Sequence, residues 1–261
     1  MAADVFSFKN MRTIVTTVGT KNWKTREQWL EKTLKKIPSG ARILDAGAGE
    51  QKYKRFCPNL NYVAQDFAEY DGKGDGRGLQ KGKWDQSELD IVSDISAIPE
   101  PDSSFDAIMC VEVLEHLADP ISAIREFSRL LKPGGHLVLT APFCSLTHFS
   151  PYHFFTGFNR YFYENNLKRF GLDILELVAN GNYFEYLAQE IRRISSIASQ
   201  YCNTSPRKYE LVAMKIILRM LQRFTGKDAG SKELLCFGYL VLASKSVDSP
   251  NEIATNDYSD V

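Results

Sequence analysis

The sequence predicts an α/β fold with a doubly wound, mostly parallel sheet and a helical insert before its last strand. Between residues 25 and 178, short apolar segments alternate with amphipathic segments of helical periodicity, a pattern typical of parallel sheets with helical crossovers. Unusual glycine and acidic residues follow the strand candidates, at the edge where such sheets bind ligands. Two longer amphipathic segments then precede a final apolar strand candidate.

Length and charge narrow the class of protein. At about 150 residues per domain, 261 residues correspond to roughly 1.7 domains, so we expect one large domain with an elaboration. Hydrophobic residues make up 44% and charged residues 25% of the chain, as in ordinary globular proteins. Lys+Arg and Asp+Glu both number 32, and no nucleic-acid partner is expected because such partners favour a basic excess.

The cysteines and the hydropathy predict a cytoplasmic protein. The five cysteines are scattered and no pair has CxxC spacing, which suits a reducing compartment better than a disulfide framework or a thiolate zinc site. The first residues contain no apolar core of signal-peptide length, and no stretch approaches the roughly 18 apolar residues of a membrane span.

An N-terminal helical cap is predicted over residues 1–40. Thr25 to Gln28 fits a capping box, and Pro38 to Gly40 ends the helix that follows. Its apolar stripe comprises Trp29, Leu30, Leu34 and Ile37.

The core domain is expected over residues 41–182. A buried strand at 41–46 breaks into Gly47-Ala48-Gly49, a short helix is expected at 50–57, and a second strand ends at Asp66. The segment 71–82 contains five of the 17 glycines and is predicted to be a plain mobile loop. A phosphate cradle or a calcium loop is disfavoured, since no strand–helix context and no twelfth-position acid are present.

Regular structure is predicted to resume with strands at 90–93 and 105–111. Asp119-Pro120 begins a helix, because Asp caps well and Pro suits the first helical position. A strand at 136–140, a helix from about Tyr163 and a strand at 172–178 follow. The insert covers 183–232 with helices near 183–201 and 207–224, the last strand covers 233–245, and the polar tail 246–261 is expected to be disordered.

Acids and glycines at the predicted strand ends form a cofactor pattern. Asp45 stands two residues before Gly47, and Asp66 follows 21 residues after Asp45. The first carboxylate can hold a cationic amine, and the second can accept hydrogen bonds from the hydroxyls of a ribose. This order suits S-adenosylmethionine better than a dinucleotide, whose third fingerprint glycine is replaced by Lys52. Taken singly, Asp45 reads equally well as a turn cap and Asp66 as a solvated strand end.

The segments ILDAGAGEQKY, YVAQD, SDISAIPEPDSSFDAIMCVEVLEHL and LKPGGHLVLTAPF closely resemble class I S-adenosylmethionine-dependent methyltransferases of the type 11, small-molecule group. The resemblance covers about residues 42–178 and the last strand. It implies a Rossmann-like sheet of seven strands with the last antiparallel. It also implies a cofactor set: Asp45, Gly47, Ala48 and Gly49 at the methionine end, Asp66 and Phe67 at the ribose, Asp94 and Ile95 at the adenine, and Val111 beneath the sulfonium.

An aromatic segment over residues 143–163 follows the fifth strand and is interpreted as a substrate lid. The alternative is a hydrophobic cover, since aromatic side chains dominate cores. As a lid it offers His148 or His153 as general base, because the histidine pKa lies near working pH. Glu112 and His116 are further catalytic candidates. The acceptor candidates are Phe143, Tyr152, Arg160 and Tyr161; methyltransferases of surface-glycan gene clusters show a similar histidine-to-Arg-Tyr pattern.

The string Glu112-x-x-Glu115-His116 resembles a magnesium-binding motif of small-RNA 2′-O-methyltransferases, and ubiquinone-pathway O-methyltransferases share it. We predict no metal, because two carboxylates and one imidazole are too few ligands without a defined fourth.

The helical insert is basic between Arg192 and Lys232 and has an apolar side. A solvated basic face is the common explanation, and a weak contact with a membrane surface is the alternative. The whole pattern predicts a methyltransferase acting at oxygen on a small or lipid-linked, glycan-type acceptor. An RNA 2′-O-methyltransferase-like enzyme with a metal at ExxEH and a non-catalytic binding module are the rival interpretations.

Overall fold

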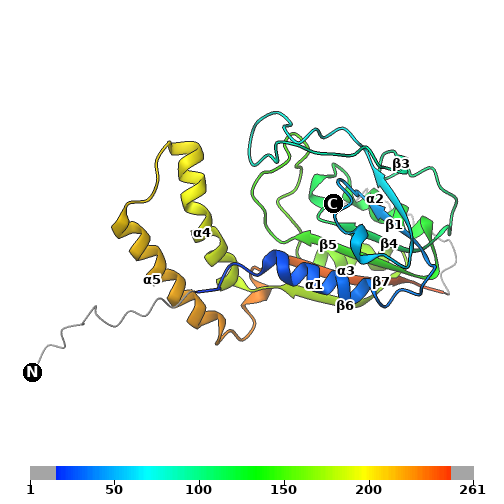
Figure 1. Ribbon diagram of the computed structural model, residues 1–261. Helices are drawn as coiled ribbons and strands as arrows, with labels where there is room; N and C mark the ends of the chain where they lie inside the picture. Colours follow the sequence, from blue (N-terminus) through cyan, green and yellow to red (C-terminus); the bar gives the residue numbers. More distant parts are fainter. Residues whose placement is uncertain (1–15, 248–261) are drawn as a thin grey trace, which may run out of the picture.

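The computed structural model describes residues 16–247 (Figure 1); the first 15 residues and nearly all of the predicted disordered tail lie outside this range. A seven-stranded sheet has the order β3-β2-β1-β4-β5-β7-β6. All neighbouring pairs are parallel except those of β7 with β5 and β6. The predicted fold class is therefore confirmed. The strands are β1 Arg42–Ala46, β2 Asn61–Asp66, β3 Ile91–Val92, β4 Phe105–Val111, β5 Leu131–Pro142, β6 Leu172–Asn180 and β7 Gly238–Lys245.

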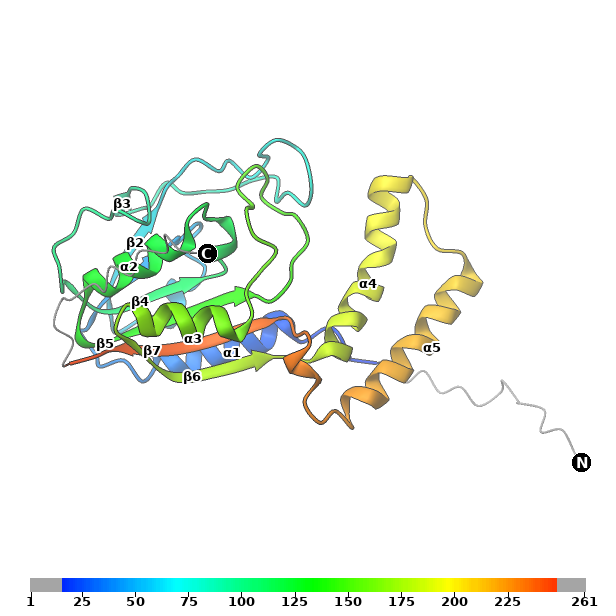
Figure 2. The same cartoon turned by 180° about the vertical axis from the view of Figure 1, so that it is seen from behind.

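Helices cover both faces of the sheet, α1 (Asn22–Leu34) on one side and α2 (Pro120–Leu130) with α3 (Arg160–Arg169) on the other (Figures 1 and 2). The side chains of β4 alternate between the two layers. Met109 packs in the cluster with Leu30 of α1, whereas Ile108 packs in the cluster with Phe127 of α2. This two-sided burial explains why the strand reads as a continuous apolar run.

Several element boundaries differ from the predicted ones. Helix α1 begins at Asn22, three residues before the proposed capping box at Thr25, and its N-cap makes no side-chain hydrogen bond. The segment 50–57 contains only a single 3₁₀ turn, Lys54–Phe56. Helix α3 begins at Arg160 instead of Tyr163, because the Asn159 side chain accepts a hydrogen bond from the backbone of the first turn. The last strand begins at Gly238, after a 3₁₀ turn at Ser231–Glu233.

The predicted start of α2 is confirmed. The carboxylate of Asp119 accepts hydrogen bonds from the backbone N–H groups of Ile121 and Ser122 at 3.1 and 3.0 Å, and Pro120 is the first helical residue. All five cysteines are free, as the absence of paired spacing predicts.

The insert forms a hairpin of two helices, α4 (Tyr183–Cys202) and α5 (Lys208–Thr225), that stands away from the sheet (Figures 1 and 2). A small cluster fixes the hairpin to the N-terminal segment, with Val18, Ala188, Leu218 and Leu221 buried together. None of the helices within residues 16–247 is both long and apolar enough to cross a membrane.

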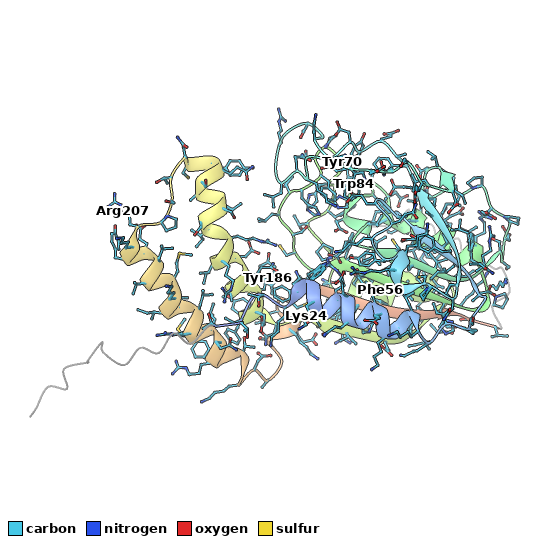
Figure 3. The ribbon with its side chains drawn as sticks, in the orientation of Figure 1. Lys24, Phe56, Tyr70, Trp84, Tyr186 and Arg207 are labelled. Atoms are coloured by element: carbon cyan, nitrogen blue, oxygen red, sulfur yellow. The ribbon has the colours of Figure 1, made fainter. Side chains whose placement is uncertain are left out.

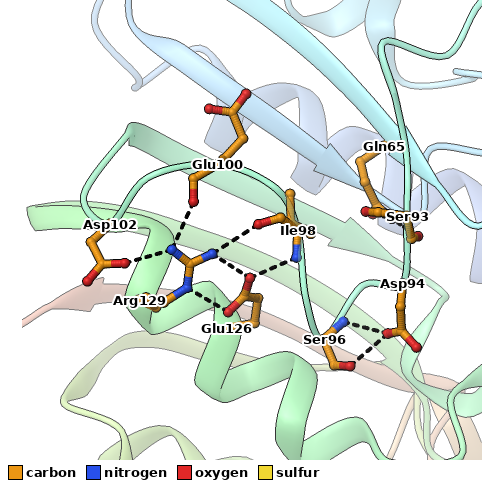
Figure 4. Close-up of polar contacts among 9 residues, drawn as sticks. All are labelled: Gln65, Ser93, Asp94, Ser96, Ile98, Glu100, Asp102, Glu126 and Arg129. Atoms are coloured by element: carbon orange, nitrogen blue, oxygen red, sulfur yellow. Dashed lines mark hydrogen bonds and ion pairs between the residues drawn. The ribbon is translucent and has the colours of Figure 1, made fainter.

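One arginine holds the loop between β3 and β4 against α2 (Figure 4). The Arg129 guanidinium donates to the Glu126 carboxylate at 2.6 Å and to the carbonyl oxygens of Ile98 and Glu100 at 3.1 and 2.9 Å. Glu126 also accepts the backbone N–H of Ile98 at 2.8 Å. The loop from Asp94 to Asp102 therefore has a fixed path alongside α2, from the carboxyl end of β3 back toward the start of β4.

Candidate active site

Two cavities lie beside the carboxyl ends of β1, β2, β4 and β5. The larger has a volume of about 620 Å³ and is lined by residues that follow β1, β2 and β3, including Gly47, Asp66 and Asp94. The smaller has a volume of about 380 Å³ and is lined by Arg26, Glu112, Glu115 and His148 among others. The ring of Phe149 lines both cavities, so the aromatic segment separates them.

The glycine turn after β1 forms the edge of the larger cavity. The backbone N–H groups of Gly47 and Ala48 donate to the carbonyl of Gln65 at 2.9 and 2.8 Å. Gly47 has a φ of 76°, and a Cβ there would lie 2.6 Å from a methyl group of Val113. Only glycine combines this left-handed backbone with such a close approach, which explains the residue type at this position.

Asp66 connects the glycine turn to the following loop. One carboxylate oxygen accepts the Gly49 N–H at 2.9 Å, and the other accepts the side-chain amide of Gln86 at 2.9 Å. Asp66 is only 6% exposed but lines the larger cavity. Phe67 lies beside it, edge-on to the ring of Tyr152 at 4.9 Å.

Asp94 and Ile95 line the larger cavity beyond the end of β3. One oxygen of the Asp94 carboxylate accepts both the backbone N–H and the hydroxyl of Ser96, each at 2.7 Å (Figure 4). The backbone at this point is therefore a tight polar turn, and the buried side chain of Ile95 adds an apolar surface next to it.

Asp45 and Val111 lie beneath the cavities and are not among the described residues that line them. Asp45 is 2% exposed, and its carboxylate accepts the hydroxyl of Tyr62 at 2.5 Å. Burial raises the pKa of Asp45 to about 7, although the hydrogen bond from Tyr62 opposes the shift. Asp45 is therefore a buried carboxyl group below the glycine turn, with a pKa close to neutral pH.

Glu115, His116 and His148 meet next to the smaller cavity, with one potential ligand atom of each within 4.8 Å of the others. The Nδ1 of His116 bonds the carbonyl of Tyr152 at 2.5 Å, and the Nδ1 of His148 bonds that of Leu146 at 2.8 Å. Because carbonyls only accept, each Nδ1 carries the proton. The two Nε2 lone pairs consequently face Glu115, at 3.8 and 4.0 Å from its carboxyl group.

Burial favours the neutral form of each group in this cluster. Desolvation raises the pKa of Glu115 well above its usual value, with the charge of Glu112 adding to the effect. Desolvation lowers the pKa of His116 to about 3 and also lowers the pKa of His148. The His116 Nε2 and one oxygen of Glu115 are buried without a hydrogen-bond partner among the described residues, so the cluster has unused capacity to bind a hydrogen-bonding group or a cation.

Arg26 of α1 reaches the smaller cavity and forms an ion pair with Glu112. Glu112 has a φ of 57° and also accepts the hydroxyl of Thr140 at 2.9 Å. The Nε of Arg26 is buried without a partner among the described residues. Sequence reasoning missed Arg26 because it lies on one face of a helix outside the motifs; an arginine among the apolar positions of that helix is the signal that was available.

Of the remaining predicted acceptor-binding and base residues, only Tyr152 lines one of these two cavities. Tyr152 lines the larger cavity, and His153 lies 3.1 Å from the hydroxyl of Ser145 with its ring 4.9 Å from that of His148. Phe143 instead packs against the core, and Tyr161 is 68% exposed. Arg160 lines a third, separate cavity, where it pairs with Glu164 at 2.7 Å and Glu233 at 3.4 Å.

The glycine-rich loop packs on the aromatic segment. Leu79 forms a backbone bridge with His148, and the N–H of Asp75 donates to the carbonyl of Ser150 at 3.1 Å. Farther along, Trp84 covers the glycine turn, where a Cβ on Gly49 would lie 2.5 Å from its ring. The loop predicted over residues 71–82 therefore covers the site. Trp84 and Gln86 also line the larger cavity, although no sequence motif includes them.

A family model described as a methyltransferase domain matches residues 23–177, more than half of the chain. The chain belongs to this methyltransferase family. A methyltransferase domain agrees with the S-adenosylmethionine cofactor that the sequence motifs lead us to expect. The matched region ends within β6, so strands β1 to β5 fall inside it, whereas Gln189, Arg193 and Phe237 in the wall of the smaller cavity lie beyond it.

A curated relative agrees with this assignment, and solved structures share the fold. The methyltransferase is 38% identical over 105 residues to a ubiquinone biosynthesis O-methyltransferase of Xanthomonas oryzae pv. oryzae, a match that covers 39% of this chain and 43% of the relative. A putative sarcosine dimethylglycine methyltransferase from Galdieria sulphuraria superposes with a TM-score of 0.52 at 17% identity, covering 86% of each chain.

A [4+2]-cyclase, SpnF, also superposes, with a TM-score of 0.51 at 18% identity over 88% of this chain and 84% of the cyclase. These structural likenesses show the shared fold alone, because fold does not fix chemistry. The curated match spans less than half of the relative's length.

Asp45 yields a prediction about stability. Its pKa is raised in the folded protein, so between about pH 4 and 7 the folded state retains a proton that the unfolded state has lost, and stability falls as pH rises. Asp45→Asn removes this dependence. We expect the melting temperature of the variant, relative to wild type, to be higher at pH 8 than at pH 5 by calorimetry. A difference that does not change with pH would contradict the assignment, and Asp85→Asn, an exposed acid, is the matched control.

Proposed function

We propose that the methyltransferase acts on the oxygen of a small or lipid-linked hydroxyl acceptor, with the cofactor in the larger cavity and the acceptor in the smaller. The observation that carries this proposal is the junction of the two cavities at Phe149, beside the histidine cluster. In-line displacement requires acceptor, methyl carbon and sulfur to lie along one line, so two adjoining compartments suit it. The curated O-methyltransferase relative supports oxygen as the nucleophile.

The cofactor is proposed to extend from the glycine turn to the end of β3. Asp66 would accept the ribose hydroxyls in place of the Gln86 amide, and Asp94 with Ile95 would bind the adenine. Gly47, Ala48 and Gly49 would border the methionine end of the cofactor. Asp45 is buried beneath these residues and would support the turn without touching the cofactor. Arg26 lines the smaller cavity and would therefore lie on the acceptor side of the junction.

His148 is proposed as the general base in preference to His153. It lines the smaller cavity, its Nδ1–H is held by the Leu146 carbonyl, and its Nε2 lone pair is therefore available. Bound S-adenosylmethionine would supply the methyl group to the acceptor oxygen and leave with the carbon–sulfur electrons, and Nε2 of His148 would take the hydroxyl proton. The products are the methyl ether and S-adenosylhomocysteine.

The acceptor class is proposed from the wall of the smaller cavity. Gln189 and Arg193 of α4 line it together with Ser145, and these donors suit a polar, oxygen-rich molecule such as a phenolic or glycan-type acceptor. A direct test is to incubate the protein with methyl-deuterated cofactor and separate small-molecule, lipid and RNA extracts. We expect mass spectrometry to find the labelled methyl on a small molecule or lipid; label in RNA alone would favour the RNA interpretation.

The first prediction of this proposal concerns Asp66. Asp66→Ala removes the ribose acceptor, and we expect S-adenosylhomocysteine to bind about 10- to 100-fold more weakly by isothermal titration calorimetry, because hydrogen bonds to a charged group are strong. Asp85→Ala, an exposed acid on the same loop, should bind normally. Wild-type affinity in Asp66→Ala would remove this residue from the cofactor site.

The second prediction compares the two histidines. We expect His148→Ala to lower kcat by about 10²- to 10⁴-fold, as expected for a lost general base, while the affinity for S-adenosylhomocysteine and the melting temperature change little. His153→Ala should reduce kcat by less than about 10-fold. Turnover is measured on the labelled product identified above. The reverse order of effects would assign the base to His153.

A second candidate mechanism uses a divalent cation. The specific observation is the convergence of Glu115, His116 and His148 with unpartnered buried atoms, and Glu112 adjoins the same cavity. These oxygen and imidazole ligands fit a transition metal or Zn²⁺, or Mg²⁺ with added waters. Such an ion would supply Lewis-acid activation of the acceptor hydroxyl, and the four side chains would hold it.

The two mechanisms predict different responses to metal removal. For the metal-free mechanism we expect full turnover after treatment with EDTA, and dialysed protein without stoichiometric magnesium or zinc by elemental analysis. Activity that is lost with EDTA and restored by added Mg²⁺ or Zn²⁺ would establish the metal mechanism instead. Under that result, Glu115→Gln should abolish the restoration, since it weakens a ligand with little change in shape.

A further inference from the structure

Helix α5 carries an apolar stripe on the side opposite its buried face. Helical residues three or four apart lie on one face, and Leu218 and Leu221 form the face that packs on α4 and the N-terminal segment. At 100° per residue, a second row of side chains points about the other way. This outward stripe comprises Tyr209, Val212, Ile216 and Met220, which are 64%, 43%, 55% and 40% exposed.

Helix α5 carries seven exposed large apolar side chains: the four of the stripe, and Leu211, Ile217 and Phe224 on its other sides. Single exposed apolar side chains are normal, whereas a contiguous row marks an interaction surface. The hairpin stands clear of the sheet in both opposite views (Figures 1 and 2), and Arg207 at the start of α5 lies at its outer end, far from the sheet (Figure 3). Neither the sheet nor its flanking helices cover the outward stripe.

Basic residues accompany the outward stripe. From residue 207 to residue 227 the chain has six basic side chains and one acidic side chain, Glu210. At 100° per residue, Lys208, Lys215 and Arg219 form a row along one border of the stripe, and Arg223 lies within it. Apolar side chains with cations beside them are the pattern of helices that lie in the interface of an anionic bilayer.

A second copy of the chain fits this surface less well. In a symmetric dimer the same patch meets itself, so the basic rows of the two α5 helices would lie close together without acidic partners. An anionic surface instead supplies the complementary charge for each cation while accepting the apolar side chains.

We propose that the outward stripe of α5 docks the methyltransferase on the surface of an anionic lipid bilayer, with the helix lying in the interface plane. The apolar side chains enter the headgroup boundary, and Lys215, Arg219 and Arg223 pair with lipid phosphates. The inference does not depend on which acceptor is methylated, and it places the helical insert rather than the sheet against the lipid.

The test is flotation of the full chain with phosphatidylcholine vesicles, with and without phosphatidylglycerol. We expect binding only with the anionic lipid, weakened by added salt. Lys215→Gln/Arg223→Gln should weaken binding by about 10- to 30-fold, as expected when two interfacial cations are lost. Ile216→Ser/Met220→Ser should also reduce binding strongly. All four side chains lie on the helix exterior or its border, and unchanged affinity for S-adenosylhomocysteine verifies that the variants are folded.

Matched controls distinguish binding through this surface from non-specific adsorption of the protein to vesicles. Leu175→Ser removes an equally exposed side chain, at 55%, from β6, and Lys168→Gln/Arg169→Gln removes two exposed cations from α3; both should bind vesicles like wild type. Absence of flotation, or equal losses in the controls, would overturn the proposal. Sedimentation velocity showing a dimer that Ile216→Ser/Met220→Ser dissociates would overturn it in favour of self-association.

Discussion

Glu115 and His116, which follow β4, attach the aromatic segment 143–163 to the carboxyl end of the sheet. The carbonyl of Glu115 accepts the N–H groups of Phe154 and Phe155 at 2.9 and 3.1 Å, while the ring of His116 bonds the carbonyl of Tyr152. These three hydrogen bonds between residues 152–155 and the 3₁₀ turn Leu114–His116 after β4 hold the aromatic segment over the cavities. The segment in turn carries Phe149 between them and pairs with Leu79 of the glycine-rich loop.

Attaching the aromatic segment in this way has an electrostatic cost. The attachment buries a carboxyl group and an imidazole where water cannot solvate their charges, and the pKa values of both move toward the neutral forms. A buried group without a hydrogen-bond partner destabilises the fold. Strained or unsatisfied groups persist mainly where function requires them, and this supports our proposal that the cluster takes part in the reaction.

Much of the larger cavity follows from sequence because parallel strands end at a common edge. Asp66 and Asp94 could be placed together from the strand pattern alone, and the structure puts both in one cavity wall. The position of a residue along a strand does not show how deeply its side chain is buried, however. Asp45 follows the same pattern but lies under the glycine turn, bonded to Tyr62.

The smaller cavity was less predictable because its walls come from distant segments. Arg26 arrives from α1 and Arg193 from α4, and neither belongs to a motif. Arg160 shows the converse: its residue type suggests anion binding, yet α3 begins three residues early and directs it toward Glu164 and Glu233. Helix starts capped by one asparagine amid aromatic residues leave little periodic signal.

If the ribose binds Asp66 as we propose, cofactor binding exchanges one hydrogen bond for another, because the carboxylate oxygen that accepts the Gln86 amide would accept a ribose hydroxyl instead. The loop that carries Gln86 would then lose one of its attachments. Leu79, Gln80 and Lys81 of the same loop line the smaller cavity. In this arrangement, occupancy of the larger cavity would be thermodynamically linked to the shape of the smaller one, and by reciprocity an acceptor that tightens the loop would alter the affinity for cofactor by the same factor.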